Sequence, residues 1–267
     1  MEFEQLRANA LKKVRQDVRV EKQKEDKLVV EAMQAIDELD DVFNLIVERV
    51  KTWYAYHYPE LEKLVRDQSA YLEIIKEFKT KEQMMEESLK HFVGDEQAKR
   101  IAVQALDSMG ADVQGKDLER IALMAELALH VKKERDELAK YVEERVQELA
   151  PNMHALVGGM LAARLIARAG SMQRLAEMPA STIQVLGAEK ALFAHLRKGT
   201  PSPKHGLIFH SSYIIQAPRK MRGKIARALS SKLAIAARED YFEGKDISKE
   251  LVAGLEKRVA AIRGAKQ

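Results

Sequence analysis

The sequence of 267 residues contains no cysteine, only six prolines and one tryptophan. Without cysteine there is no disulfide scaffold, no thiol nucleophile and no cysteine-ligated zinc or iron–sulfur centre. The apolar runs are short and interrupted by Lys or Arg, whereas a bilayer span needs about 20 apolar residues, so we expect no membrane partner. The first residues are acidic and lack the apolar segment of a signal peptide. These absences predict a soluble intracellular protein.

Basic and acidic side chains are distributed unevenly along the chain. The net charge is only +4, yet residues 28–150 carry −10 and residues 151–267 carry +12. Within 164–238, 14 basic residues accompany only Glu177 and Glu189. A split of this size indicates a surface that binds a polyanion, although an ordinary solvated helical surface gives the same pattern.

The acidic part predicts two long helices. Apolar residues over 29–58 follow an a/d heptad pattern that ends before Pro59. A second apolar stripe starts after Lys116, with Asp117 as N-cap, and runs to about 149. Shorter helices are expected over 61–78, 81–93 and 95–109. Because a lone helix cannot bury its stripe, each long helix needs the other or a second copy of the chain. An intramolecular hairpin and a dimerisation arm therefore remain equal alternatives. For a dimer, the contacting residues would be Ile36, Leu39, Phe43, Ile46, Val50 and Trp53.

The basic part predicts shorter helices joined by turns. Pro151 suits the first position of a helix, Ser171 suits an N-cap, and Gly199 suits a C-terminal cap of a helix that starts near 187. Residues 180–186 are expected to be a connector and 200–206 a loop. A short apolar segment over 207–216 precedes helices over 219–238 and 246–263.

Chemical motifs in this part favour binding over catalysis. Lys220, Lys224 and Arg227 share one face of the 219–238 helix, which suits contact with phosphates. A base could stack on His210 or Tyr213. The histidines have no third metal ligand in sight, and no phosphate-loop or dinucleotide motif occurs. We therefore expect no enzymatic activity, no metal and no cofactor.

Several separated strings resemble the Nop domain shared by box C/D small-ribonucleoprotein core proteins and a spliceosomal relative. They occupy residues 184–193 (QVLGAEKALF), 203–210 (PKHGLIFH) and 222–229 (RGKIARAL), with further similarity over 53–61 and 150–159. The similarity covers roughly residues 28 to 241 and is greatest to the archaeal counterparts of the paired eukaryotic nucleolar proteins.

The resemblance implies an all-α fold, in which a long antiparallel coiled-coil arm is followed by a compact helical Nop domain. It implies a non-enzymatic scaffold of the ribonucleoprotein that guides 2′-O-methylation of rRNA or tRNA. The implied partners are a box C/D guide RNA at its kink-turn, the ribosomal-protein-like subunit bound there, and a second copy of the chain paired through the coiled coil. The expected location is the cytoplasm of an archaeal cell, or the nucleolus for a eukaryotic homologue.

The resemblance also sets the domain boundaries. It implies a linker-helix remnant over 1–27, the coiled-coil domain over 28–150 and the Nop domain over 151–267. In the family a separate N-terminal domain recruits fibrillarin, the S-adenosylmethionine-dependent methyltransferase, and 27 residues are too few for it. Fibrillarin is therefore an expected partner only if the full-length protein carries that domain.

Carried over residue by residue, the resemblance implies an RNA-binding set. Lys190 is expected to contact phosphate. The Glu189 carboxylate would accept a hydrogen bond from an exposed base edge or from a neighbouring Lys or Arg. The alternative is that Glu189 caps a turn. His210 could instead be a packed core histidine, and ordinary solvation is the alternative for the basic residues of 220–227. The complete set is Gln184, Gly187, Ala188, Glu189, Lys190, Arg197, Lys198, Lys204, His205, His210, Lys220, Arg222, Lys224 and Arg227.

The competing hypothesis is a structural coiled-coil protein that engages only other proteins. It accounts for the arm but gives the basic strings no specific role. Charge reversal at Lys190, Lys224 and Arg227 would distinguish the two, because only an RNA-binding protein needs those charges for assembly.

Overall fold

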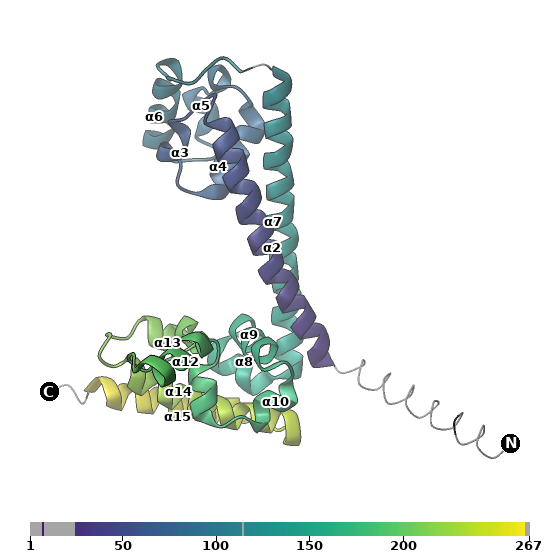
Figure 1. The fold of residues 1–267 in the computed structure, drawn as a ribbon, viewed down its shortest axis with the longest axis vertical. Coiled ribbons are helices and arrows are strands. Elements are labelled where there is room, and N and C mark those ends of the chain that lie inside the picture. The colour runs from purple at the N-terminus through teal and green to yellow at the C-terminus, as the bar shows by residue number, and fades with distance from the viewer. Residues whose placement is uncertain (1–6, 8–24, 114, 265–267) are drawn as a thin grey trace. The chain divides into compact units, whose positions relative to one another are not determined.

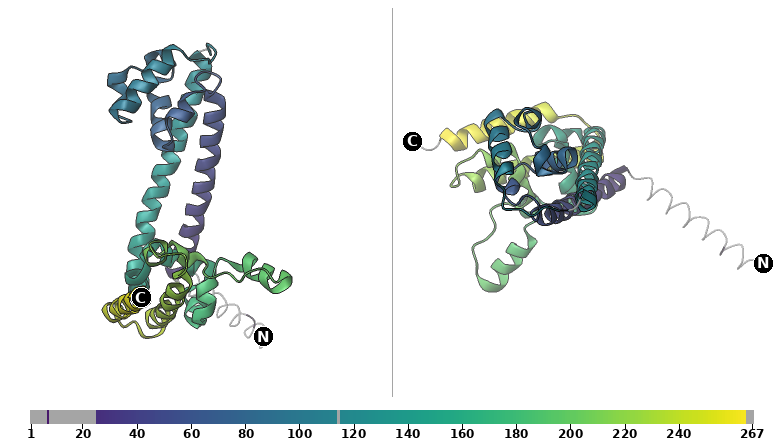
Figure 2. Two further views of the ribbon diagram at one scale, coloured as in Figure 1. Left: turned by 90° about the vertical axis from the view of Figure 1, so that its left-hand side faces the viewer. Right: turned by 90° about the horizontal axis from the view of Figure 1, so that it is seen from above.

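The computed structural model describes residues 7, 25–113 and 115–264, so the predicted linker helix over 1–27 lies almost entirely outside the described residues. Within them every regular element is a helix, which confirms the all-α prediction (Figures 1 and 2). None of these helices is long and apolar enough to cross a membrane. The described residues form two compact units, one within residues 36–138 and one that combines residues 25–35 with 139–264.

Two long helices, α2 (Glu25–Tyr54) and α7 (Gly115–Leu149), run side by side (Figure 1). In the unit of residues 36–138, Arg135 donates to Asp40 through Nε at 2.8 Å and through Nη2 at 3.2 Å. The Nζ of Lys132 lies 6.0 Å from the ring centroid of Phe43. Lys132 and Arg135, two charged residues within the apolar stripe of α7, therefore contact α2. Asp117 lies in the first turn of α7 and not at its N-cap, because the helix begins two residues earlier.

The predicted heptad seam is buried within a single chain. Ile36 and Val50 have no exposed surface, and Val50 belongs to a core cluster that includes Ile121 and Ala125 of α7. Phe43 and Ile46 are partly buried against that cluster, and Leu39 is half-buried. Trp53 alone among the six predicted dimer residues is exposed, at 38%. In this arrangement Ile36 and Val50 are unavailable to a second copy, because α7 and the core already cover the seam.

Between the long helices lie α3 (Leu61–Leu64), α4 (Gln68–Phe78), η1 (Lys81–Gln83), α5 (Glu86–Leu89) and α6 (Asp95–Leu106). The predictions of single helices over 61–78 and 81–93 are wrong. Asp67 accepts from the Ala70 N–H at 2.8 Å, so it caps α4 and breaks the first predicted helix. The second breaks at Met84 and Met85, whose ψ angles of 72° and 145° are not helical and separate η1 from α5.

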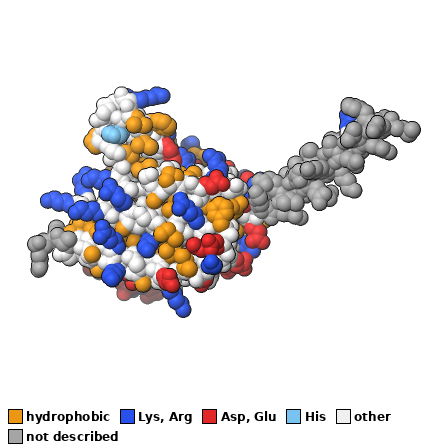
Figure 3. All heavy atoms as spheres, turned by 90° about the horizontal axis from the view of Figure 1, so that it is seen from below, with side chains coloured by type: hydrophobic (Ala, Val, Ile, Leu, Met, Phe, Trp, Pro, Cys, Tyr) orange, Lys and Arg blue, Asp and Glu red, His pale blue; other side chains and the backbone are white. Residues whose placement is uncertain are grey.

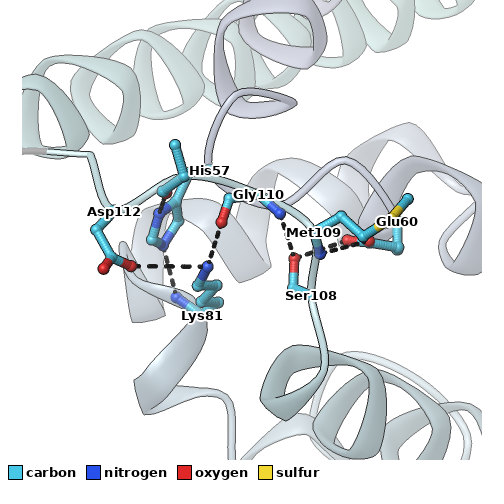
Figure 4. Close-up of polar contacts among 8 residues, drawn as sticks. His57, Glu60, Lys81, Ser108, Met109, Gly110 and Asp112 are labelled. Carbon is cyan, nitrogen blue, oxygen red and sulfur yellow. Dashed lines mark hydrogen bonds and ion pairs between the residues drawn. The ribbon is translucent and has the colours of Figure 1, made fainter.

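A polar cluster fastens this region to the end of α2 (Figure 4). Buried His57 accepts from the Lys81 N–H through Nε2 at 2.9 Å, so its Nδ1 carries the proton and donates to the Ala111 carbonyl at 3.1 Å. Lys81 Nζ donates to the Gly110 carbonyl at 2.8 Å. Glu60 accepts from the Ser108 hydroxyl at 2.8 Å. These bonds join residues 57–60, which follow α2, to residues 108–111, 48 to 54 positions later in the sequence.

The second unit contains the remaining helices. They are α8 (Pro151–Val157), α9 (Gly159–Ala169), α10 (Met172–Glu177), α11 (Ala180–Val185), α12 (Glu189–Lys198), η2 (Leu207–His210), α13 (Ser212–Ile215), α14 (Arg222–Arg238), the π-helical η3 (Glu239–Glu243) and α15 (Ser248–Gly264).

Helix α14 is the centre of this unit and contacts α8, α10, α11 and α15. Its residues Ile225, Leu229 and Leu233 are fully buried. Residues 180–186 form helix α11 and not the expected connector, because packing against α14 stabilises a helix too short to predict from its own sequence. The Ser171 hydroxyl accepts from the Arg174 N–H at 3.1 Å, which confirms the predicted cap.

Carboxylates from other elements cap three consecutive helices of this unit. Asp240 accepts hydrogen bonds from the N–H groups at the start of α8. Glu143 of α7 accepts hydrogen bonds from the N–H groups of Gly159 and Met160 in α9. Asp26 of α2 accepts a hydrogen bond from the N–H group of Met172 in α10. The five distances lie between 2.9 and 3.0 Å. A helix start has unpaired N–H donors and a positive dipole end, so each carboxylate satisfies both.

The environment of two capping carboxylates differs. Burial raises the pKa of Asp240 despite its bonds to the Met153 and Asn152 N–H groups. For Glu143, burial also raises the pKa, but the bonds from Gly159, His154 and Met160 outweigh it and lower the pKa overall. Asp240 is therefore held by its hydrogen bonds at a desolvation cost, whereas Glu143 is stabilised as an anion.

Asn152 joins three of these elements through its side chain. Its Nδ2 donates to Asp240 and to the Lys245 carbonyl, each at 2.7 Å, and its Oδ1 accepts from the Ile247 N–H at 2.8 Å. The residue has no exposed surface. Helix α8, η3 and the approach to α15 therefore depend on one amide.

We predict that Asn152→Ala lowers the free energy of unfolding by about 2–3 kcal/mol, because it removes three hydrogen bonds made by a fully buried amide. Urea denaturation followed by circular dichroism measures this. Asn44→Ala, at an exposed position of α2, is the matched control and should change stability by less than about 0.5 kcal/mol. Equal effects of the two substitutions would contradict the role assigned to Asn152.

Candidate nucleic-acid interface

The first two motif strings are joined by a short backbone ladder. The Gly206 N–H donates to the Gln184 carbonyl and the Leu207 N–H to the Leu186 carbonyl, each at 2.8 Å. The Gln184 side chain donates to the Lys204 carbonyl at 2.7 Å. A Cβ at Gly206 would lie 2.0 Å from the Leu186 carbonyl oxygen, so only glycine permits this approach. The loop before η2 is thereby fixed to the end of α11.

The third string joins the first two through side chains. The imidazole of His205 stacks on the ring of Phe209 with centroids 4.7 Å apart, and the Arg222 guanidinium lies 5.4 Å from the same ring centroid. Arg222 also donates to the Ala217 carbonyl at 3.0 Å. The stem of Lys204 packs at Gly223, where a Cβ would lie 3.7 Å from it. The three strings therefore form one continuous surface.

The charge state of His205 follows from these neighbours. Burial lowers its pKa, and the positive charges of Arg222 and Lys204 lower it further. The ring is consequently neutral at pH 7, where it stacks without adding to the local positive charge.

Helix α12 carries its side chains outward. In α12, every residue of which the structure describes, no side chain is buried, and the helix stands off from the rest of its unit (Figure 2). It begins after Gly187, whose φ of +87° is a conformation that favours glycine, and ends at left-handed Gly199. A helix that contributes nothing to a core has its surface available for a partner.

The start of α12 is fixed by Glu189. Its carboxylate accepts from Arg168 Nε at 3.1 Å and Nη2 at 2.6 Å, and from the Gly187 N–H at 2.8 Å. Pairing with a neighbouring Arg and the capping-turn role, given as alternatives from sequence, are thus combined in one side chain. The pair orients the helix start and leaves Lys190 exposed beside it.

The bond from Arg168, with that from Gly187, lowers the pKa of Glu189 to about 2. Because the folded-state pKa lies below its ordinary value of 4.5, the stabilisation is present above pH 4.5 and is lost as the pH falls towards 2. We predict that the Glu189 carboxyl titrates in this low range and that Arg168→Met moves its midpoint up towards 4.5. Carbon-13 chemical shifts of the carboxyl group measure both. Arg174→Met is the control and should leave the midpoint in place.

Cationic and apolar residues occupy neighbouring strips of α12. Lys190 and Arg197, seven residues apart, share a face, and Lys198 extends it. Phe193 and Leu196, three residues apart, are 58% and 70% exposed. The first strip suits phosphates, and the second suits an apolar partner surface.

The structure distinguishes positioning residues from free cations within the predicted set. Gln184, Glu189 and Arg222 are bonded within the chain, and Ala188 is the half-buried N-cap position of α12. The core alternative for His210 is wrong, because this residue is exposed. The remaining basic residues are exposed, and they are Lys190, Arg197, Lys198, Lys204, Lys220, Lys224 and Arg227.

Sequence reasoning left Arg168, Phe209 and Phe193 out of the set. Arg168 could have been found as a partner for one of the two acids within 164–238, but the other two carry no signal before the fold is known. Among the described residues, no three His, Asp or Glu side chains gather where they could hold a metal ion.

Comparisons with known proteins agree with the motif strings. Residues 35–261 match the family model described as "Nop: snoRNA binding domain, fibrillarin". A NOP5 family protein of Methanocaldococcus jannaschii is 46% identical over 241 residues, which cover 90% of this chain and 58% of that protein. Nucleolar protein 58 of Schizosaccharomyces pombe is 40% identical over 236 residues, which cover 88% of this chain and 46% of that protein.

A solved structure is also similar. The crystal structure of a fibrillarin/Nop5p complex matches with a TM-score of 0.52 at 28% identity, and the match covers 98% of this chain and 79% of that chain. The chain spans about half the length of the curated relatives it matches.

Proposed function

The chain belongs to the Nop family, and on that premise we propose that it is a non-enzymatic scaffold of a box C/D ribonucleoprotein that guides 2′-O-methylation of rRNA or tRNA. It binds a composite surface, made of the kink-turn of the guide RNA and the ribosomal-protein-like subunit on that kink-turn. In an archaeal cell this places it in the cytoplasm, and a eukaryotic homologue would be nucleolar.

The observation that carries this proposal is the exposed helix α12. Its cationic strip of Lys190 and Arg197 fits RNA phosphates, while the adjacent apolar strip of Phe193 and Leu196 fits a protein. Neither strip alone is large, so a partner that offers both phosphate and apolar surface gains from both. Binding to a preformed protein–RNA complex is therefore favoured over binding to either component.

We predict that affinity for a box C/D kink-turn RNA rises strongly when the ribosomal-protein-like subunit is already bound. Gel-shift titrations with and without the subunit measure this. Affinity for the complex should also fall with rising salt concentration, because several phosphates are neutralised. Equal affinity in the two titrations would contradict the composite surface.

Lys190→Glu should abolish assembly while helicity is retained, and Lys257→Glu, an equal charge reversal at an exposed position of α15, should not. If Lys190→Glu left assembly intact, the protein-only scaffold would be favoured instead. The exposed Phe193 and Leu196 support that second function, because an apolar strip by itself indicates a protein partner.

We propose that the arm also pairs two copies of the chain, through a surface that shares only Trp53 with the predicted seam. Val42, Leu45 and Trp53 lie on one exposed stripe of α2, with Leu45 68% exposed. Leu123 and Leu127 form a second exposed stripe on α7. Exposed apolar residues at helical spacing are typical of a helix–helix interface.

Leu45→Glu should weaken self-association at least about tenfold, because a buried unpaired carboxylate costs more than about 1.4 kcal/mol. Analytical ultracentrifugation over a concentration series measures this. Val103→Glu, at an exposed position of α6, is the control for an added charge and should leave self-association unchanged. A wild-type chain that stays monomeric throughout would contradict the dimer itself.

Fibrillarin is proposed as a partner on narrower grounds. The similar chain of known structure is in complex with fibrillarin. We propose that this protein recruits fibrillarin only through an N-terminal domain of the kind the family carries, and that residues 25–264 serve RNA, subunit and self-association.

A further inference from the structure

A second cationic surface lies between α14 and α15. The two helices enclose a groove of about 610 Å³. Its rim carries Lys224 and Arg227 of α14 together with Lys232 and Arg258, and Leu255 and Ile262 form part of its apolar wall. Only the first two of these cations belong to the surface described above.

The groove keeps its positive charge. No acidic side chain is among the residues that line it, and none of its four cations forms an ion pair with a described residue. The acidic Glu256 of α15 lies in a separate groove with Tyr213 and Arg263. On helix α15, Arg258 therefore faces α14, whereas Glu256 faces α13.

The side chain of Lys232 is directed across the groove. Its Nζ lies 2.9 Å from the place where a Cβ on Gly254 would be, so it reaches over α15 at the point where that helix has no side chain. The ammonium group is therefore brought from α14 towards α15, which carries Arg258 four residues after Gly254. Lys232 of α14 and Arg258 of α15 therefore both lie at this groove.

The groove continues from the loop surface. Lys204 packs at Gly223, which immediately precedes Lys224, so the cations run from the loop along α14 to α15 without interruption by an acid. Figure 3 shows a face of the molecule on which several Lys and Arg side chains gather.

We propose that this groove binds the sugar–phosphate backbone of the RNA strand that continues beyond the kink-turn. The inference rests on the proposed function and extends it to a second RNA segment. From Lys224 to Lys232 the helix axis advances about 12 Å, so the groove is long enough to contact more than one phosphate of a single strand. No aromatic side chain is among the residues that line the groove, so it contacts phosphates and not bases.

The experiment uses two RNAs bound to the ribosomal-protein-like subunit: a minimal box C/D kink-turn and the same kink-turn with a single-stranded extension. The full chain is titrated against both over a range of salt concentrations. We expect the wild type to bind the extended RNA more tightly. The double variant Lys232→Ala/Arg258→Ala should lose this increment, and the slope of log affinity against log salt should shrink by about 1.4 because two phosphate contacts are lost.

The matched control is Lys249→Ala/Lys257→Ala, which removes two exposed charges from α15 outside the groove. This control variant should still bind the extended RNA more tightly than the minimal kink-turn, with the wild-type slope of log affinity against log salt. Equal behaviour of the two double variants overturns the groove proposal while leaving the composite-surface proposal intact. Failure of the wild type to bind either RNA complex overturns the proposed function instead. Loss of subunit binding by the groove variant in the absence of RNA would mean that a protein occupies the groove, which also overturns the inference.

Discussion

The helical domain depends on carboxylates that accept from the N-termini of helices belonging to other elements. Asp26, Glu143 and Asp240 connect α2, α7 and η3 to α10, α9 and α8 respectively. Short helices of six to eleven residues have little stability of their own, so a charged cap with a fixed position decides where each begins and which neighbour it meets. Glu189 applies the same chemistry to the start of the exposed helix α12.

This use of acids explains the uneven charge of the domain. Residues 151–267 contain eight acidic side chains against 20 basic ones, and Asp240 and Glu189 are already bonded at helix starts. The cations of the loop, α12 and α14 therefore face solvent without local neutralisation. Acidic side chains such as Asp240 and Glu189 hold helix N-termini, while the basic side chains of Lys190, Lys224 and Arg227 lie on the surface.

The sequence predicted what local patterns determine and missed what tertiary contacts determine. Periodicity predicted the two long helices, the resemblance implied the all-α fold, and local chemistry gave the Ser171 cap and the end of α12 at Gly199. The break after Leu64 and the helix over 180–185 were missed, because a capping bond at Asp67 and packing against α14 decide them. The heptad pattern could not show which helix packs against the seam of α2, because an intramolecular seam and a dimer seam require the same residues. The pairing of Arg168 with Glu189 joins residues 21 apart and leaves no periodic trace.

The cap at Asp240 has a consequence for how the chain acquires its structure during synthesis. Asn152 precedes its carboxylate partner Asp240 by 88 residues in the sequence, and Asp26 precedes its partner Met172 by 146 residues. The cost of closing such loops grows only slowly with their length, but the contacts cannot form before the later residue has been made. Helix α8 leaves the ribosome long before η3, so its cap can form only after Asp240 has emerged. A nascent chain that ends before Asp240 has its arm helices but no cap for α8.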